Sequence, residues 1–204
     1  MQSRILNLIF FFIIYLVFLA WYDGWTQSPI TEEELLEWSG DIPDDVAAGD
    51  VSANLRRMAR EDDGKEFFML NLNRYTYADG EAQQGAPASY QAYGRAVLPL
   101  LIKRASHPIY MAAMPDYLIT GELKHAPWHE VALVRYRSRR DFLDMVSSDE
   151  YLAIVATRQG GIDFAEVTFT HPGLNLASPR LFVLMFIVLV AFVIDRLLKR
   201  RINT

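Results

Sequence analysis

The chain has 204 residues, a formal net charge of −5 and no cysteine, and 51% of its residues are hydrophobic. This length suits one modest domain with additional segments. The negative charge argues against binding to nucleic acid, which depends on basic surfaces that neutralise phosphates. The absence of cysteine is compatible with an oxidising compartment and removes thiolates from the possible metal ligands.

The first notable feature is an apolar run from Ile5 to Tyr22, which as a helix approaches the thickness of a bilayer core. Trp21 and Trp25 cluster at its end, where interfacial aromatic residues occur. A cleaved signal peptide is the alternative, because Arg4 precedes the run. However, the run is longer than the apolar region of a usual signal peptide, and no A-x-A pattern follows it. We therefore expect an uncleaved transmembrane signal anchor over residues 1–22.

A second apolar run, Leu181–Ile194, lies near the end of the chain and is followed by "DRLLKRR". A buried core helix is the alternative for a run of this length. The run is almost fully aliphatic and ends in basic residues, which favours a second transmembrane helix over residues 180–204, after a linker at 173–179.

The charges that flank the two runs predict an orientation. Basic residues lie at the outer end of each run, whereas the stretch from Tyr22 to Leu55 is rich in carboxylates and contains no lysine or arginine. By the positive-inside rule, both termini are expected in the cytoplasm and the central region outside it. The protein is therefore predicted to be an integral membrane protein with a domain that is periplasmic in a Gram-negative bacterium.

Residues 23–65 are predicted to form an acidic helical stalk. Thr31 and Glu34 have the spacing of a capping box at the start of one short helix. A second short helix is expected over Val46–Arg60, and "DDG" at 62–64 then separates the stalk from the first strand.

Residues 66–172 show the pattern strand, helix, strand, strand, helix, strand, which is the ferredoxin-like βαββαβ order of an α+β domain. In that fold the spatial strand order is 4-1-3-2 and both helices cover one face of an antiparallel sheet. The expected elements are a strand at 66–74, a helix over Ser89–Ala105, strands in "HPIYMAAMP" and "WHEVALVRYRS", a helix in "RRDFLDMVSSDEYLAIVATRQ", and a strand in "GGIDFAEVTFTH".

The other face of this sheet is bare in a single copy and is expected to be apolar. The residues expected to line it in part are Phe67, Met69, Val131, Leu133, Ile162 and Phe164. A patch of this size is unusual on a soluble surface, so a second copy is expected to cover it.

Three segments resemble a known family: "YQAYGRAVLPLLIKRASHPIYMA", "WHEVALVRYRSRRDFLDM" and "SSDEYLAIVATRQ". They resemble the domain-of-unknown-function branch of the dimeric α/β-barrel superfamily over residues 66–171. That branch shows two tyrosines three apart, a helical proline, and a serine-x-glutamate-tyrosine ahead of an arginine. The matching residues here are Tyr90, Tyr93, Pro99, Ser148, Glu150, Tyr151 and Arg158. The sequence departs from the family at Ser106-His107, which replace a usual pair of glycines, and at Met145, which replaces a common aromatic residue.

Candidate ligand residues follow from the side chains that share one sheet face. If Phe68, Leu70 and Leu72 meet the helices, Asn71 and Asn73 face the interior of a two-sheet barrel. The same reasoning places polar residues of the third and fourth strands there, with Asn71 between Arg135 and Glu166. The full set of pocket candidates is Asn71, Asn73, Tyr90, Tyr93, His129, Arg135 and Glu166. A polar group in an apolar cavity is typical of a small-ligand site. A solvent-wetted sheet face and an ion pair that fixes the dimer are the alternatives.

No cofactor or metal is expected. His125 and His129 are four apart, but Pro127 lies between them and the stretch leads into a strand, so they do not share a helical face. One enzymatic subgroup of the superfamily degrades haem with an asparagine, a tryptophan and a helical histidine. The asparagines and Trp128 invite that comparison, but the helix that should carry the histidine has none, so haem is not expected. "SSDEY" is predicted to be a helix cap.

Three functions remain open. The first is a membrane-tethered binding or accessory domain, active as a homodimer or as a subunit of a larger membrane complex. The second is a cofactor-free small-barrel enzyme, an oxygenase, isomerase or lyase that acts on a small apolar or aromatic substrate. The third is a structural dimerisation module whose interior is filled by side chains. Two membrane spans favour the first, because a tethered domain is best placed to meet a membrane partner or a lipid-soluble ligand.

Overall fold

The computed structural model describes residues 2–41, 50–80, 85–118, 127–171, 173, 175 and 178–202. The chain divides into two compact units, one formed by Met1–Thr26 with Gly173–Thr204 and the other by Gln27–Pro172.

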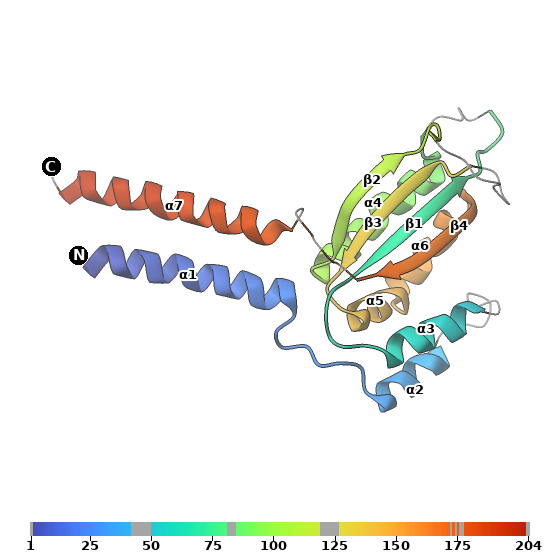
Figure 1. Ribbon diagram of the computed structural model, residues 1–204, viewed down its shortest axis with the longest axis horizontal. Helices are drawn as coiled ribbons and strands as arrows, with labels where there is room; N and C mark the ends of the chain where they lie inside the picture. The colour runs from blue at the N-terminus through green and yellow to red at the C-terminus, as the bar shows by residue number, and fades with distance from the viewer. Residues whose placement is uncertain are drawn as a thin grey trace. The chain divides into compact units, whose positions relative to one another are not determined.

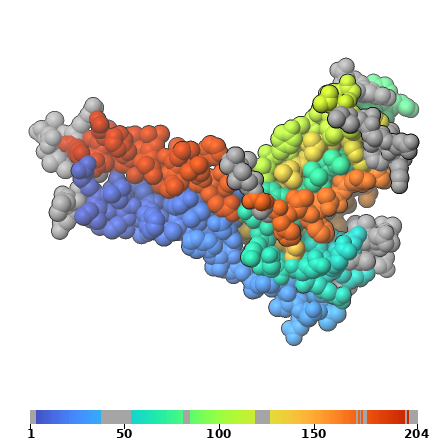
Figure 2. Space-filling model, viewed as in Figure 1, coloured from blue at the N-terminus to red at the C-terminus, as the bar shows by residue number. Residues whose placement is uncertain are grey.

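The larger unit is an α+β domain built on a four-stranded antiparallel sheet (Figure 1). Its elements are α2 (Glu32–Asp41), α3 (Asp50–Arg60), β1 (Phe67–Tyr75), α4 (Ala88–Lys103), β2 (His107–Ala113), β3 (Glu130–Tyr136), α5 (Arg139–Val146), α6 (Asp149–Gln159) and β4 (Ile162–Thr170). The strands lie in the order β2-β3-β1-β4, which confirms the predicted ferredoxin-like arrangement. Helices α4 and α6 cover one face of the sheet, while the side chains of the strands form the surface on the other (Figures 1 and 2).

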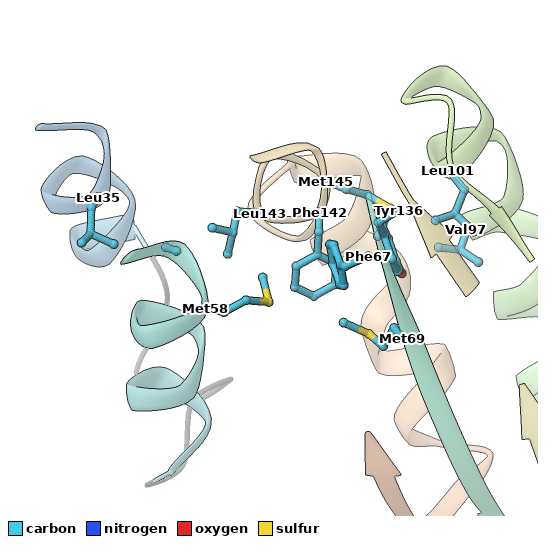
Figure 3. Close-up of a cluster of buried hydrophobic side chains, with 11 residues drawn as sticks. Leu35, Met58, Phe67, Met69, Val97, Leu101, Tyr136, Phe142, Leu143 and Met145 are labelled. Carbon is cyan, nitrogen blue, oxygen red and sulfur yellow. The ribbon is translucent and has the colours of Figure 1, made fainter. Parts of the chain in front are cut away.

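The register of β1 decides which side chains meet the helices. Phe67 pairs with Tyr136 and Met69 with Val134, and all four belong to or pack against the buried core. Figure 3 shows Phe67 and Met69 on the same side as Phe142 of α5. Phe67 and Met69 therefore face the helices, and the expectation that they line the bare face is corrected.

The same register moves the alternate residues of β1 to the open face. Phe68, Leu70 and Leu72 lie opposite Arg135, Leu133 and Val131 of β3. The sequence pattern predicted that these three residues of β1 face the helices. The reason for the difference is that β1 is apolar on both faces at its start, so its pattern fits either orientation, and a shift of one residue exchanges the faces.

Helices α2 and α3 pack as part of the domain. The predicted capping box is present, because the Thr31 amide donates to Glu34 Oε2 at 2.8 Å and the Glu34 amide donates to Thr31 Oγ1 at 3.3 Å. Leu35 and Met58 are buried in the same core as the sheet residues (Figure 3). Helix α3 begins at Asp50, and residues 46–49 of the predicted helix lie outside the described residues.

The single helix predicted after β3 is two helices, because the chain breaks at Ser147-Ser148. The Ser147 amide donates to the Leu143 carbonyl at 3.0 Å and closes α5. Ser148 has extended backbone angles, and its hydroxyl accepts from the Tyr151 amide at 3.3 Å. The predicted cap at "SSDEY" is thereby confirmed.

The smaller unit contains α1 (Gln2–Asp23) and α7 (Pro179–Ile202), which lie side by side and antiparallel (Figure 1). Arg4 forms a two-point ion pair with Asp195, with both contacts at 2.8 Å. At the opposite ends of the helices, Arg180 lies 2.6 Å from Asp23.

Within the described residues, one helical segment, Arg4–Asp23, is long and apolar enough to cross a membrane. A signal sequence or the core helix of a soluble protein can have the same length and composition. The predicted C-terminal span is not supported in the same way, since the described part of α7 does not meet this criterion.

Candidate functional site

A group of polar side chains is buried where β1 and β3 meet the start of α4. Asn73 of β1 has no exposed surface and lies opposite Glu130 of β3 in the sheet register. Its Nδ2 donates to the Tyr90 hydroxyl at 2.9 Å and to Glu130 Oε1 at 3.2 Å. Its Oδ1 is buried and has no hydrogen-bond partner. An unpaired buried amide oxygen is costly, so this atom marks a place where a donor is missing.

Tyr75 brings a second unpaired atom to the same place. Only 5% of its surface is exposed, and its buried hydroxyl makes no hydrogen bond of good geometry. Its ring lies 5.1 Å from that of Tyr90 and 5.9 Å from that of His129. The Tyr75 amide donates to His129 Nδ1 at 3.0 Å, so the imidazole accepts at that nitrogen. We call Asn73, Tyr75, Tyr90 and Glu130 the Asn73 site.

Gly161 allows α4 to carry Tyr90 into this position. A Cβ atom at Gly161 would lie 2.7 Å from Ser89 Oγ and 2.9 Å from the Tyr90 backbone nitrogen. Only a glycine permits so close an approach between the start of β4 and the first turn of α4. The sequence analysis did not single out Gly161. The double glycine at 160–161 before a strand was the signal available for it.

Burial sets the protonation of the tyrosines. It raises the pKa of Tyr90 to about 12, with the Glu130 charge as the next largest cause. Burial, followed by Glu130, also raises the pKa of Tyr75 well above the ordinary phenol value. For Tyr93, which lies 5.9 Å from Tyr90 between ring centroids, burial again raises the pKa. The phenols are therefore neutral at physiological pH and act as hydrogen-bonding groups.

Four of the predicted pocket residues thus come together: Asn73, Tyr90, Tyr93 and His129. They do so between the sheet and the helices and not on the open face. The sequence analysis missed Tyr75, and it did not include Glu130. Both residues lie at strand ends, where the pattern of alternating side chains gives no signal.

The other three predicted residues lie elsewhere. Asn71 donates to the carbonyl of Met69 in its own strand at 3.2 Å. Arg135 is buried and pairs with Glu66 at 2.6 Å, so the expected arrangement with Asn71 between Arg135 and Glu166 is not present. Glu166 lines a groove of about 610 Å³ whose other residues are Asn54, Leu70, Leu72, Ala165, Val167 and Thr168.

The described residues contain no group of three or more histidine, cysteine or acidic side chains that could hold a metal ion. His125 lies outside the described residues. The chemistry that the Asn73 site offers is therefore a carboxylate, an amide oxygen and two phenols.

No protein-family model matches the sequence, and a search of curated proteins gave no match. Among solved structures, a protein of unknown function from Rhodopseudomonas palustris is similar at 23% identity and a TM-score of 0.51, over 63% of this chain and 95% of that one. A methylated form of that protein gives 26% identity and a TM-score of 0.50, over 64% and 95%. SnoaB, a cofactor-independent oxygenase from Streptomyces nogalater, gives 10% identity and a TM-score of 0.38, over 56% and 99%. The first two likenesses agree with the ferredoxin-like fold of the domain.

Proposed function

We propose that the protein is a membrane-tethered binding domain that holds a small ligand at the Asn73 site, outside the cytoplasm. The observation that carries the binding role is the pair of unpaired buried atoms, Asn73 Oδ1 and the Tyr75 hydroxyl, beside one carboxylate. Buried polar groups in proteins are almost always hydrogen-bonded, so each exception calls for an explanation, of which a functional role is one. Tyr90, Glu130 and His129, which lie beside these atoms, are only half-buried.

The membrane tether is supported by the surface of the helix pair. The most exposed apolar side chains of α1 and α7 include Leu6 at 66%, Phe12 at 60% and Phe186 at 66%. Apolar surface on this scale is unfavourable in water and favourable in lipid. The Arg4–Asp195 and Asp23–Arg180 pairs lie at opposite ends of the helices, where bilayer headgroups and water would solvate them. With both helices as spans, both termini are cytoplasmic.

We further propose that two copies associate through their open sheet faces, as a homodimer or within a larger membrane complex. Leu70, Leu72, Val131 and Leu133 lie on that face and are only half-buried within one chain. Covering them with a second sheet would remove apolar surface from water.

A cofactor-free enzyme is the second candidate, and one observation favours it. Glu130 makes no ion pair within the described residues and lies beside the neutral Tyr75 phenol. A half-buried carboxylate next to a phenol is able to move a proton at a bound substrate. Binding remains the leading proposal because it needs only the unpaired acceptors and the tether.

The test compares bound molecules in the full chain purified from membranes in mild detergent. We expect a small molecule to co-purify with the natural chain, as detected by mass spectrometry of the denatured sample. It should be lost in Tyr75→Phe, which removes the unpaired hydroxyl and keeps the ring, and in Asn73→Leu.

Asn71→Leu is the matched control, since Asn71 lies on the same strand face and, within the described residues, its side chain donates to the Met69 carbonyl of its own strand. This variant should retain the molecule. The proposal is wrong if the natural chain carries no bound molecule. It is also wrong if Asn71→Leu and Asn73→Leu lose the bound molecule to the same extent.

A further inference from the structure

The Asn73 site carries one negative charge that the described protein does not neutralise. Within the described residues Glu130 forms no ion pair; it accepts from the neutral Asn73 amide at 3.2 Å and interacts with the Tyr75 and Tyr90 phenols. The residues that contact it most closely, Asn73, Tyr75 and Tyr90, are uncharged. Arg158 lowers the pKa of the neighbouring Tyr90 without reversing the effect of burial. A half-buried carboxylate without a cation favours a positively charged partner.

The atoms of the Asn73 site that have hydrogen-bonding capacity left are mainly acceptors. Both described side-chain bonds of Asn73 use its Nδ2 group, which leaves the Oδ1 lone pairs unused. Glu130 is an acceptor in its ionised form, and the Tyr75 hydroxyl can also accept. A ligand that satisfies these atoms must bring several N–H donors.

The surrounding rings also favour a cation. Tyr75 and Tyr77 lie 6.3 Å apart between centroids with nearly perpendicular planes, and Tyr77 lies 6.2 Å from His129. Faces of electron-rich rings attract ammonium groups, and more strongly where water is excluded.

We propose that the ligand of the Asn73 site is a small protonated amine, with its ammonium group bound between Glu130 and Asn73 Oδ1. The ammonium group carries three N–H donors and one positive charge, which match the unpaired acceptors and the unneutralised carboxylate. This inference rests on the proposed binding function and adds the chemical class of the ligand.

The test uses three probes that share one alkyl chain and differ in charge: n-butylammonium chloride, n-butanol and sodium butyrate. Each is titrated into the full chain in a non-ionic detergent and followed by isothermal calorimetry. We expect butylammonium to bind about ten-fold more tightly than butanol, since hydrogen bonds to charged groups contribute at least that factor. Butyrate should bind least.

Glu130→Gln keeps the shape of the side chain and removes its charge, and it should lose the preference for butylammonium over butanol. Glu166→Gln makes the same change at a carboxylate on the open face and should leave the preference intact. Tyr75→Phe is a second variant, which keeps the ring and should weaken butylammonium binding while the chain remains folded by circular dichroism.

Each outcome decides between the proposals. If butanol or butyrate binds as tightly as butylammonium, or if Glu130→Gln keeps the preference, the amine is wrong while the binding function stands. If no probe binds and a molecule still co-purifies in an Asn73-dependent way, the amine is again wrong and the binding function holds. If no probe binds and nothing co-purifies, both are overturned.

Discussion

The geometry of the Asn73 site depends on close contacts made by single residues. Asn73 reaches Tyr90 because Gly161 lets the first turn of α4 approach β4, and it reaches Glu130 through the register of β1 with β3. Gly160, its neighbour, has no such constraint, since an added Cβ would meet the Ala156 carbonyl at an ordinary 3.5 Å.

Gly161→Ala should therefore destabilise the protein, because the new methyl group meets backbone and Ser89 atoms that cannot move aside freely. We expect a loss of about 1–3 kcal/mol, as for other overpacked sites. Gly160→Ala is the matched control and should change stability by less than about 1 kcal/mol. Thermal unfolding of both variants measures the difference, and equal effects would contradict the described approach of α4 to β4.

At the scale of elements, the sequence predicted the strands and their order and two of the helix caps, but it predicted one helix where α5 and α6 are separate. These features depend on local patterns: the Thr31–Glu34 spacing, the Ser148 cap and the alternation along β3. The orientation of β1 could not be predicted in the same way. Phe67, Phe68, Met69 and Leu70 are all apolar, so both faces of the strand suit the core, and long-range packing decides between them.

Tertiary contacts also explain why the Asn73 site could be predicted only in part. Asn73 and Tyr90 were predicted members, but the partners that define their role come from the register of β1 with β3 and from the approach of α4. Glu130 lies opposite Asn73 only in that register. Contacts of this kind are tertiary and leave no periodic signal in the sequence.

The capping box of α2 gives a pH-dependent contribution to stability. Hydrogen bonds from Arg140 and then from the Thr31 amide lower the pKa of Glu34 to about 2. Because the folded pKa lies below the ordinary value of 4.5, the contribution is complete above about pH 4.5 and is lost as the pH falls toward 2.

Glu34→Gln should thus reduce the free energy of unfolding at pH 7 by at most about 1 kcal/mol, since the pair is partly exposed. The difference from the natural chain should shrink between pH 4.5 and 2. Urea unfolding at several pH values tests this, with Glu33→Gln as the control for loss of charge in the same turn. A difference that stays constant down to pH 2 would show that the ion pair is not its source.

The whole molecule combines a domain that has a buried polar site with a pair of apolar helices. Its topology is testable because the natural chain has no cysteine. Lys65 has a side chain that is 80% exposed, and a second cysteine can be added after Thr204.

A membrane-impermeant maleimide should label Lys65→Cys in cells with an intact cytoplasmic membrane. In cells that have an outer membrane, that membrane is first made permeable. The cysteine added after Thr204 should react only after lysis, because both termini are expected in the cytoplasm. Labelling of the C-terminal cysteine in intact cells would contradict two spans.

The proposed dimer predicts that Leu133→Asp, which places a charge on the open sheet face, converts the full chain in detergent from dimer to monomer. The change leaves a buried charge unpaired in the interface, at a cost of several kcal/mol. Leu98→Asp is the control, since Leu98 is 43% exposed on α4, on the other side of the sheet. Sedimentation equilibrium should show a dimer for it and for the natural chain, and a monomeric natural chain rules the dimer out.

The most direct test of the central claim is the stability of Tyr75→Phe without ligand. If the Tyr75 hydroxyl is unpaired in order to bind a ligand, its removal should stabilise the ligand-free chain by about 1–3 kcal/mol, the cost of an unsatisfied buried group. Tyr90→Phe should instead destabilise by a similar amount, since it removes the acceptor of Asn73 Nδ2. Chemical unfolding of the two variants in detergent gives both values. We expect Tyr75→Phe to raise the free energy of unfolding and Tyr90→Phe to lower it. If Tyr75→Phe lowers it instead, the Tyr75 hydroxyl is hydrogen-bonded within the fold, which contradicts a ligand site there.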